Sequence, residues 1–389
     1  MSAKIAIIYD RATVTHGGAE QVLLALHKLY PQAALFTSVY DPKKASWAKA
    51  FVVKASFLQK IPLARKLHRY LAILMPLAFE FLDLSGYEII ISVTSAEAKG
   101  VITRRDQLHF CYLLSPTRYL YHYREEYLQK NHLLNFFPIR WLAQTALNYL
   151  KKWDQVAIFR PDLVTPIAKV VAQRAHKYYP RLQTAHIIYP PVDRGLLEEK
   201  PTNEDPSNPV KDYFLLVARL VPYKNVDAAI LACQRLGYHL IIVGEGPEKD
   251  RLKSLIRTKL ITFRSYLSQA ELAELYRHCL AVLSPGLDDF SITALEGNLF
   301  GKPVVINQLA GASELITHRK HGLHFPYKEG DRLMKIANNL QNTLQDLTKM
   351  EFDSRQLQKN ALKYDTNSFA RNFGKALSQA YQAKKEGKL

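Results

Sequence analysis

Short apolar runs separated by amphipathic stretches recur along the whole chain. In the first half, the apolar runs predict strands at residues 5–9, 33–39, 87–93, 108–114 and 162–167. Amphipathic stretches such as 19–29 lie between several of them and favour helices. In the second half, predicted strands near Phe214, Leu240, Val282 and Val304 alternate with helical windows. This alternation predicts an α/β protein with two Rossmann-like parallel sheets.

The segment LSPGLDDFSITALEGNLFG, residues 283–301, combines a helix start with two carboxylates. The run at 280–283 predicts a buried strand, and good helix formers begin at Thr293. The backbone N–H groups and the dipole of a helix start favour an anion. Asp288 in the preceding loop and Glu296 in the first turns are placed to bind sugar and ribose hydroxyls. The segment therefore suits a nucleotide sugar, but Thr293 and Glu296 also fit a capping box that needs no ligand.

Two cations follow another predicted strand. In YFLLVARLVPYKNVD, residues 213–227, the strand ends at Ala218, and Arg219 and Lys224 follow it. Ligands of open parallel sheets bind outside the carboxyl ends of the strands, where an Arg and a Lys can neutralise a diphosphate. The alternative is a pair of solvated loop cations. The next strand ends in the turn GEGP, in which Gly246 allows backbone to approach a ligand closely.

Together with HGGAE at 16–20 and YPPVD at 189–193, these segments resemble the family-4 retaining glycosyltransferases of the GT-B fold. The resemblance runs from the first strand to about residue 330. It implies that Arg219 and Lys224 bind the donor diphosphate and that Asp288 contacts the transferred sugar, so that these three residues serve catalysis. The donor-binding residues that it implies are Gly17, Gly18, Arg219, Lys224, Gly246, Ser291, Ile292, Thr293 and Glu296.

The resemblance also implies a domain plan that agrees with the chain length. A chain of 389 residues exceeds what one hydrophobic core usually holds. We expect a Rossmann-like acceptor-side domain at residues 1–195 and a Rossmann-like nucleotide-sugar domain at 196–364, facing across a cleft. The polar, proline-rich residues 198–211 predict a surface loop near the junction. As in relatives, a helix at about 365–385 is expected to pack back on the first domain.

Departures from the family cluster around the reacting centre. The first acid, usually Glu, is Asp288, which shortens its reach by about 1.5 Å. The usual Gly two residues before the helix formers is Ser291, and the usual Gly-Gly before a later Glu reads AGASE at 310–314. Leu114 stands where related enzymes often carry His, and it cannot exchange a proton. Two alternatives therefore stay open: a catalytically silent protein that binds a nucleotide or glycan, and another Rossmann-type sugar-phosphate enzyme.

The reaction that the resemblance implies is retaining hexosyl transfer. The donor would be a nucleotide sugar such as GDP- or UDP-hexose, and the acceptor lipid-linked or a saccharide, in cell-surface polysaccharide biosynthesis. The chain contains no Asp-x-Asp triplet. We expect no metal and no cofactor besides the donor substrate, because Arg219, Lys224 and the helix start can carry the leaving-group charge. In relatives the leaving phosphate takes the acceptor proton, so the missing His need not abolish catalysis.

The net charge of +18 is concentrated in an acid-free region at residues 42–79. Its cations are Lys43, Lys44, Lys49, Lys54, Lys60, Arg65, Lys66 and Arg69, and its apolar side chains include Trp47, Phe51, Phe57 and Leu58. Such a region suits an anionic membrane surface, to which each cation contributes on the order of 1 kcal/mol. Solvated helix faces and nucleic acid are the alternatives. Because no nucleic-acid motif is present, we expect no nucleic-acid partner.

The remaining signals indicate the compartment and the acceptor side. No secretory signal pattern or membrane-length apolar run occurs, and the three widely spaced cysteines form no disulfide or metal set. We therefore expect a cytoplasmic protein that is peripheral on the cytoplasmic membrane face. The aromatic-rich residues 109–153 predict either an acceptor surface or, more commonly, core packing. His122 and His132 are candidates to replace the absent His.

Overall fold

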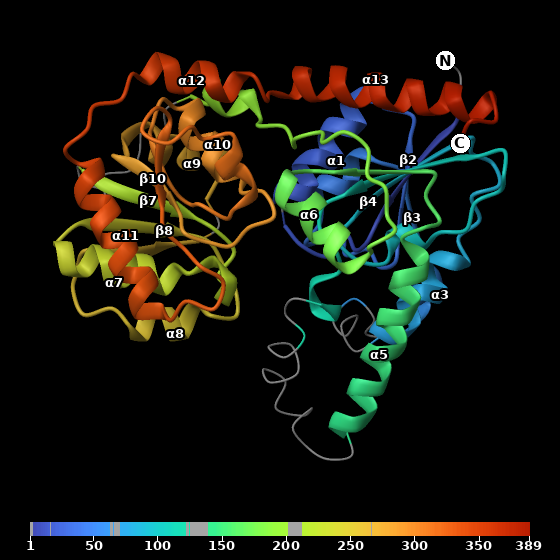
Figure 1. Cartoon of the computed structure of the whole chain (residues 1–389), viewed down its shortest axis with the longest axis horizontal. Coiled ribbons are helices and arrows are strands. Elements are labelled where there is room, and N and C mark those ends of the chain that lie inside the picture. The colour runs from blue at the N-terminus through green and yellow to red at the C-terminus, as the bar shows by residue number, and fades with distance from the viewer. Residues whose placement is uncertain are drawn as a thin grey trace. The chain divides into compact units, whose positions relative to one another are not determined.

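The computed structural model describes residues 3–15, 17–62, 65, 71–121, 124, 139–200, 212–265 and 267–389. The chain divides into two compact units. Unit 1 consists of Met1–Tyr189 and Phe369–Leu389, and unit 2 consists of Pro190–Ser368. Each unit contains a six-stranded sheet within the described residues (Figure 1).

The sheet of unit 1 is parallel, with the order β3-β2-β1-β4-β5-β6. Its strands are β1 (Ile5–Tyr9), β2 (Ala34–Thr37), β3 (Val53–Ala55), β4 (Ile89–Thr94), β5 (Leu108–Leu113) and β6 (Leu163–Pro166). Every residue of β2, β4 and β5 is buried, as expected for parallel strands that are covered on both faces. The apolar pattern predicts five of these strands and misses β3, a three-residue edge strand with an exposed lysine.

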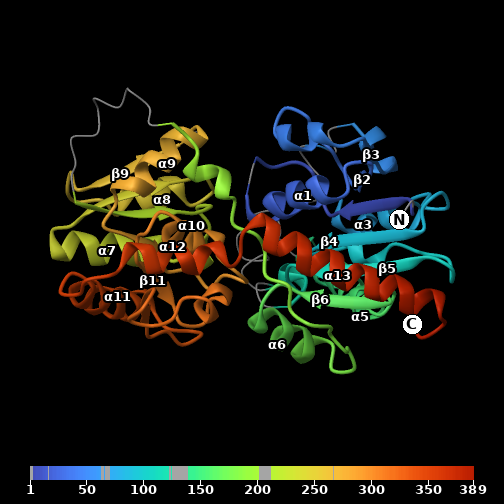
Figure 2. The same cartoon turned by 90° about the horizontal axis from the view of Figure 1, so that it is seen from above.

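Helices cover the sheet of unit 1, and one of them comes from the end of the chain. They are α1 (Gly18–Leu29), α3 (Met75–Glu80), α5 (Ile139–Ala157), α6 (Lys169–Tyr178) and α13 (Thr366–Lys385). α13 runs along the sheet (Figure 2). The ring centroid of Phe373 lies 5.1 Å from that of Phe110 and 5.6 Å from that of Tyr112, both on β5. Residues near the carboxyl end of the chain therefore complete the core of unit 1.

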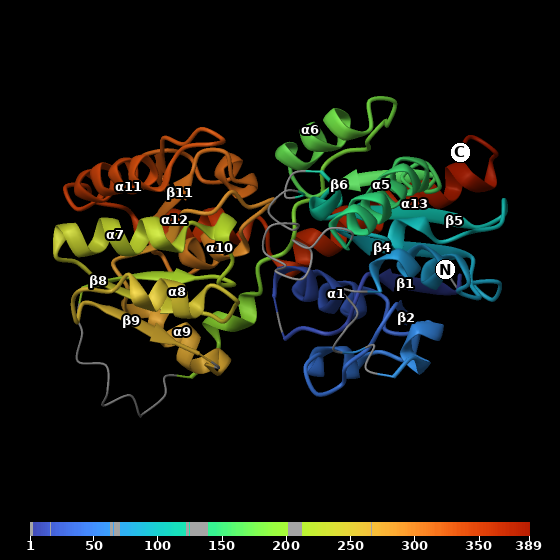
Figure 3. The ribbon, with the colours of Figure 1, turned by 90° about the horizontal axis from the view of Figure 1, so that it is seen from below.

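The sheet of unit 2 is also parallel, with the order β12-β11-β10-β7-β8-β9. Its strands are β7 (Tyr213–Val217), β8 (His239–Val243), β9 (Ile261–Arg264), β10 (Ala281–Ser284), β11 (Val304–Asn307) and β12 (Gly322–Phe325). β9 and β12, which the sequence pattern does not predict, form the two edges. The edge position of β9 is visible in Figure 3.

Helices lie on both faces of this second sheet. They are α7 (Val226–Leu236), α8 (Lys249–Ser254), α9 (Gln269–His278), α10 (Ile292–Leu299), α11 (Leu333–Leu347) and α12 (Ser354–Leu362). α7 and α11 pack together on one face, and α10 and α12 pack together on the other (Figure 1). The expected fold class, two Rossmann-like parallel sheets, is confirmed.

Two further expectations concern a surface loop and membrane-spanning segments. Most of the polar loop expected at residues 198–211 lies outside them, since 201–211 are not described. No helix of the described part of the chain is both long and apolar enough to cross a membrane.

Candidate functional site

Three loops meet at the carboxyl edge of the unit 2 sheet. The loop after β10 is joined to the 3-10 helix η8 (Pro222–Lys224), which follows β7, because the N–H of Leu287 donates to the carbonyl of Tyr223 at 2.9 Å. It is joined to η9 (Gly311–Glu314), which follows β11, because the N–H of Gly311 donates to the carbonyl of Asp288 at 3.0 Å. The backbone therefore fixes the position of Asp288 from two sides.

Gly311 permits this close approach. A Cβ at this position would lie 1.9 Å from the carbonyl oxygen of Asp289, far inside van der Waals contact. Any other residue would push η9 away from the loop. The glycine that remains in AGASE is thus needed for contact between two backbones, whereas its neighbours Ala310 and Ala312 are buried without such a constraint.

Lys224 and Asp288 form an ion pair. The Nζ atom of Lys224 lies 2.8 Å from Oδ1 of Asp288, and their side chains are 20% and 7% exposed. A carboxylate this deeply buried requires a partner, and Lys224 supplies both charge and a hydrogen bond. Lys224, which is predicted to bind the diphosphate, and Asp288, which is predicted to contact the sugar, therefore contact each other within unit 2.

Arg219 lies between two backbone contacts on the loop after β7. The N–H of Ala218 donates to the carbonyl of Val243 at 3.0 Å, and the N–H of Leu220 donates to that of Glu245 at 2.9 Å. The side chain of Arg219 itself is exposed. The loop after β8 thus holds the backbone of Arg219 while its guanidinium group remains accessible to a ligand.

The glycines of the GEGP turn make these contacts possible. Gly244 has φ +152°, and a Cβ there would lie 1.9 Å from the carbonyl oxygen of Ala218. A Cβ on Gly246 would lie 2.2 Å from the carbonyl oxygen of Leu220. The described structure therefore explains both glycines by contact with the loop that carries Arg219, and the donor contact expected of Gly246 stays a prediction.

Glu296 is buried in α10 and accepts a hydrogen bond from a tyrosine. The hydroxyl of Tyr276, on α9, donates to Oε2 of Glu296 at 2.7 Å. The capping-box alternative for Glu296 is wrong, because the N-cap residue of α10 is Ser291 and Thr293 already lies inside the helix. The N-cap residue thus lies two residues before the predicted capping position.

Ser291 has left-handed backbone angles, φ 85° and ψ 75°. Glycine adopts this conformation readily, whereas an L-residue pays about 1 kcal/mol or more. The Ser291 hydroxyl lies 2.5 Å from that of Ser284 and 3.3 Å from that of Thr293. These contacts offset part of the strain, and the backbone angles give a physical reason for the glycine of the related family.

Ile292 is the first residue of α10, whereas the predicted site residues Gly17 and Gly18 belong to unit 1. Gly17 is the N-cap residue of α1, and Gly18 is the first residue of that helix. A Cβ on Gly17 would lie 2.9 Å from Oε2 of Glu20, whose other oxygen accepts a hydrogen bond from Tyr9 at 2.6 Å. His16 lies outside the described residues, as do His122 and His132. Leu114 follows β5 and is half-buried.

A polar cluster at the carboxyl edge of the unit 1 sheet was not predicted. Asp10, directly after β1, accepts hydrogen bonds from the Thr94 hydroxyl and from the Ala98 N–H, both at 2.8 Å. Burial, reinforced by the charge of Glu97, raises the pKa of Asp10. Arg11 pairs with Glu97 at 2.7 Å. The only signal in the sequence is that Asp10 and Arg11 follow an apolar strand.

The same edge contains a fully buried ion pair. Lys99 and Asp154 lie 2.6 Å apart with side-chain exposures of 0% and 1%. Asp154 also accepts hydrogen bonds from the hydroxyls of Thr117, Tyr121 and Tyr179. This network joins α5 to the segments that follow β4 and β5. Its members are spread over 80 residues of sequence, so no local motif reveals it.

The basic, acid-free region is partly corrected by the structure. Of its four named apolar side chains, Phe57 is exposed, whereas Trp47, Phe51 and Leu58 are buried and cannot enter a membrane interface. Trp47 lies in the 3-10 helix η1 (Ser46–Ala50), Phe51 directly follows it, and Leu58 lies in η2 (Phe57–Lys60). Lys66 and Arg69 lie outside the described residues.

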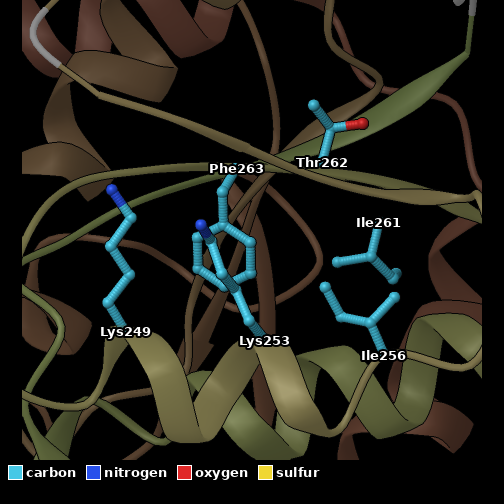
Figure 4. A pocket seen from close by; sticks show the side chains of 6 residues that line it. All are labelled: Lys249, Lys253, Ile256, Ile261, Thr262 and Phe263. Atoms are coloured by element: carbon cyan, nitrogen blue, oxygen red, sulfur yellow. The ribbon is translucent and has the colours of Figure 1, made fainter.

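A pocket of about 510 Å³ lies between α8 and β9. It is lined by Lys249, Lys253, Ile256, Ile261, Thr262 and Phe263. Figure 4 shows the side chains of Lys249 and Lys253 rising from α8. The Nζ atom of Lys249 is already paired with Glu245 at 2.7 Å. None of the predicted donor-binding residues lines this pocket, so it is separate from the candidate site.

Comparison with known proteins identifies the domain that carries the site. Residues 199–361 match the family model described as glycosyl transferases group 1. This segment is therefore similar to that family. The matched segment contains Arg219, Lys224, Gly246, Asp288 and Glu296, and it lies entirely within unit 2.

Curated relatives match parts of the chain. An uncharacterized glycosyltransferase of Methanocaldococcus jannaschii, MJ1607, is 30% identical over 130 residues, which cover 31% of this chain and 33% of the relative. A GDP-mannose-dependent alpha-mannosyltransferase of Mycobacterium tuberculosis is 32% identical over 122 residues, covering 31% and 32%. The chain thus spans about a third of the length of these relatives.

Solved structures match the whole chain. The sucrose-phosphate synthase of Thermosynechococcus elongatus superposes with a TM-score of 0.72 over 98% of this chain and 100% of that one, at 15% sequence identity. This likeness shows the fold, which is GT-B as expected from the sequence.

Proposed function

We propose that the protein transfers a hexose from a nucleotide sugar to a lipid-linked or saccharide acceptor, with retention of configuration and without a metal. The donor class would be a GDP- or UDP-hexose, and the pathway the synthesis of a cell-surface polysaccharide. The observation that carries the proposal is the ion pair of Lys224 and Asp288, which joins the loops after β7 and β10 within the segment that matches the glycosyl transferases group 1 model. The mannosyltransferase relative uses GDP-mannose, which supports this donor class.

Each of these residues has a role that its chemistry suits. Arg219 and Lys224 would neutralise the donor diphosphate, Glu296 would bind ribose hydroxyls and Asp288 would contact the hexose. The bond between the anomeric carbon and the diphosphate breaks, and a bond from that carbon to the acceptor oxygen forms on the same face. The acceptor proton passes to the leaving phosphate oxygen. Cations near that oxygen stabilise charge that grows in the transition state, which is what accelerates the reaction.

This route needs no protein base. Leu114 replaces the histidine of related enzymes and offers no group that can accept a proton. Because the leaving phosphate accepts the acceptor proton, Leu114 is compatible with turnover.

We further propose that unit 1 docks on an anionic membrane on its cytoplasmic face. Its exposed apolar side chains include Phe57, Ile73, Leu77 and Phe81, the last 72% exposed, around η2 and α3. The rings of Phe57 and Phe81 lie 6.3 Å apart. Exposed cations at Lys54, Lys60 and Arg65 accompany them. This combination of exposed aromatic rings and cations supports an interfacial site for acidic lipid.

Incubation with a panel of nucleotide sugars tests the proposal directly. Melting shifts with GDP, UDP and ADP identify the base, since a ligand stabilises the folded state that binds it. Release of the nucleoside diphosphate from the matching nucleotide sugar then measures turnover. Binding without release in the presence of membrane extracts would indicate a catalytically silent protein. Absence of any nucleotide-dependent shift would refute the donor site.

A further inference from the structure

Tyr276 holds Glu296 from a different helix. Its hydroxyl donates to Oε2 at 2.7 Å, and the two residues are 20 positions apart in sequence. Tyr276 has no exposed surface, and Glu296 is 4% exposed. The Tyr276 ring is stacked on that of Phe300, with centroids 5.3 Å apart and planes 8° from parallel. The tyrosine is therefore fixed by its ring and can present its hydroxyl at one position.

The electrostatics of the pair define which group donates. Burial and the charge of Glu296 raise the pKa of Tyr276 well above its ordinary value, so the phenol keeps its proton. A buried carboxylate is costly unless it is hydrogen-bonded, and the phenol meets that requirement for Oε2. The terminal torsion of an unrestrained glutamate is broad, so the fixed phenol also restricts the orientation of the carboxylate plane.

We propose that Tyr276 is a positioning residue for nucleotide binding: its hydroxyl holds the Glu296 carboxylate in the orientation that recognises ribose hydroxyls. This inference rests on the proposed function, in which Glu296 binds the ribose. A carboxylate oxygen has two acceptor positions, so Glu296 can accept from Tyr276 and from a ribose at once. Pre-orientation reduces the entropy that the side chain loses on binding.

The test compares ribose recognition in the parent protein and in Tyr276→Phe, which keeps the stacked ring and removes the hydroxyl. Calorimetry measures the affinity of whichever of GDP, UDP and ADP binds, and of its 2′-deoxy and 3′-deoxy forms. The parent should prefer the ribose form. In Tyr276→Phe this preference should fall by about threefold or more, as expected for the loss of one hydrogen bond of ordinary strength, with the deoxy affinities unchanged.

Tyr213→Phe is a matched control. Tyr213 is also buried, and its hydroxyl donates to the carbonyl of Leu275, on α9, at 2.9 Å. The control variant loses a buried hydrogen bond from a tyrosine to α9, the helix that carries Tyr276, but keeps the hydrogen bond to Glu296. It should lower the melting temperature to a similar extent and retain the ribose preference. Equal loss of preference in both variants would mean a general effect of stability and would overturn the inference.

Glu296→Gln separates failure of the inference from failure of the proposed function. If Glu296→Gln abolishes the ribose preference and Tyr276→Phe leaves it intact, Tyr276 is not a positioning residue, while the donor site stands. If the parent shows no ribose preference, the role of Glu296 fails and the inference fails with it. In the double variant, Tyr276→Phe should add nothing to the effect of Glu296→Gln, because the two residues act as one unit.

Discussion

The ammonium group of Lys224 lies 2.8 Å from the carboxylate of Asp288. One residue is expected to bind the diphosphate of a donor and the other its hexose, yet here their charges neutralise each other. In the proposed donor site, an arriving diphosphate would compete with Asp288 for the lysine. Once Lys224 turns to the phosphates, Asp288 loses its cation and needs a new hydrogen-bond donor. A hexose hydroxyl is such a donor, whereas a free nucleoside diphosphate offers none at that position. For the proposed donor site, we therefore expect the ion pair to favour the complete nucleotide sugar over the nucleotide product.

Asp288→Asn should reverse this preference. Without the carboxylate, Lys224 carries an uncompensated charge, and the affinity for the nucleoside diphosphate should rise several-fold. Sugar transfer should fall, because an amide is a weaker acceptor for the hexose hydroxyl than a carboxylate. Calorimetry with the diphosphate and a turnover assay measure the two effects. Asp250→Asn, which removes an exposed acid on α8, controls for net charge and should change neither. Lower diphosphate affinity in Asp288→Asn would contradict the competition.

Arg219→Ala and Lys224→Ala should each weaken binding of the nucleoside diphosphate. A charge-assisted hydrogen bond is worth about 1.5–3 kcal/mol, so the dissociation constant should rise roughly tenfold or more. Calorimetry on folded protein checks the effect. Arg235→Ala removes an exposed cation of α7 that bonds to Asn338, and should leave the affinity unchanged. If Arg219→Ala and Lys224→Ala both bind the nucleoside diphosphate as tightly as the parent does, the donor-site assignment is wrong.

At position 291 alanine should be less stable than glycine. In an ordinary helix or strand the order is the opposite, by about 0.5–1 kcal/mol. At φ 85°, however, Ser291→Ala keeps the strain and loses the hydroxyl contact with Ser284, whereas Ser291→Gly loses the contact and relieves the strain. We expect the alanine variant to unfold with a free energy about 1 kcal/mol below that of the glycine variant. Urea denaturation of the two variants measures this difference in unfolding free energy. If the alanine variant is the more stable of the two, Ser291 is not strained.

Membrane docking should depend on the location of the charges in unit 1 and not on their number. The test variant changes four cations of the basic region to Gln: Lys60, Arg65, Lys66 and Arg69. The control variant changes four exposed cations of unit 2 to Gln: Arg235, Lys259, Lys349 and Lys359. Each cation near an acidic surface is worth on the order of 1 kcal/mol.

Cosedimentation with anionic vesicles should drop sharply for the unit 1 variant and little for the control. Added salt should have the same effect on the parent, because the Debye length of about 8 Å at physiological ionic strength becomes shorter. Equal binding of the parent to anionic and neutral vesicles at low salt would exclude acidic lipid as the partner. Phe81→Ser should weaken binding without changing the salt dependence, because it removes apolar burial and no charge.

The parallel fold was predictable because strands buried on both faces read as continuous apolar runs. The residues of β4 and β5 are entirely buried, and their runs stand out. The edge strands β3, β9 and β12 did not stand out. β3 has only three residues, β9 ends in Thr262, Phe263 and Arg264, which are half-buried, and β12 begins with a glycine. β3 and β9 are only partly covered, so their patterns resemble that of a loop.

Candidate ligand-binding residues were predictable where their position after a strand places them at the ligand edge of the sheet. Arg219 and Lys224 follow a strand, and the topology of a parallel sheet puts such residues at the ligand edge. Partners far apart in sequence were not predictable. Tyr276 is 20 residues from Glu296, and the backbone strain at Ser291 appears only when its dihedral angles are known. Local patterns place residues at an edge, and tertiary packing decides which of them touch.

The contribution of α13 to unit 1 has a consequence for biosynthesis. A ribosome makes the chain from the amino end, and domains generally fold as they emerge. Residues 3–189 of unit 1 emerge first, yet Phe373, which has no exposed surface, packs on Phe110 of β5. Unit 1 must therefore wait, with part of β5 uncovered, until all of unit 2 has been translated, whereas unit 2 can close as soon as Ser368 appears. The half of the protein that is made first finishes folding last.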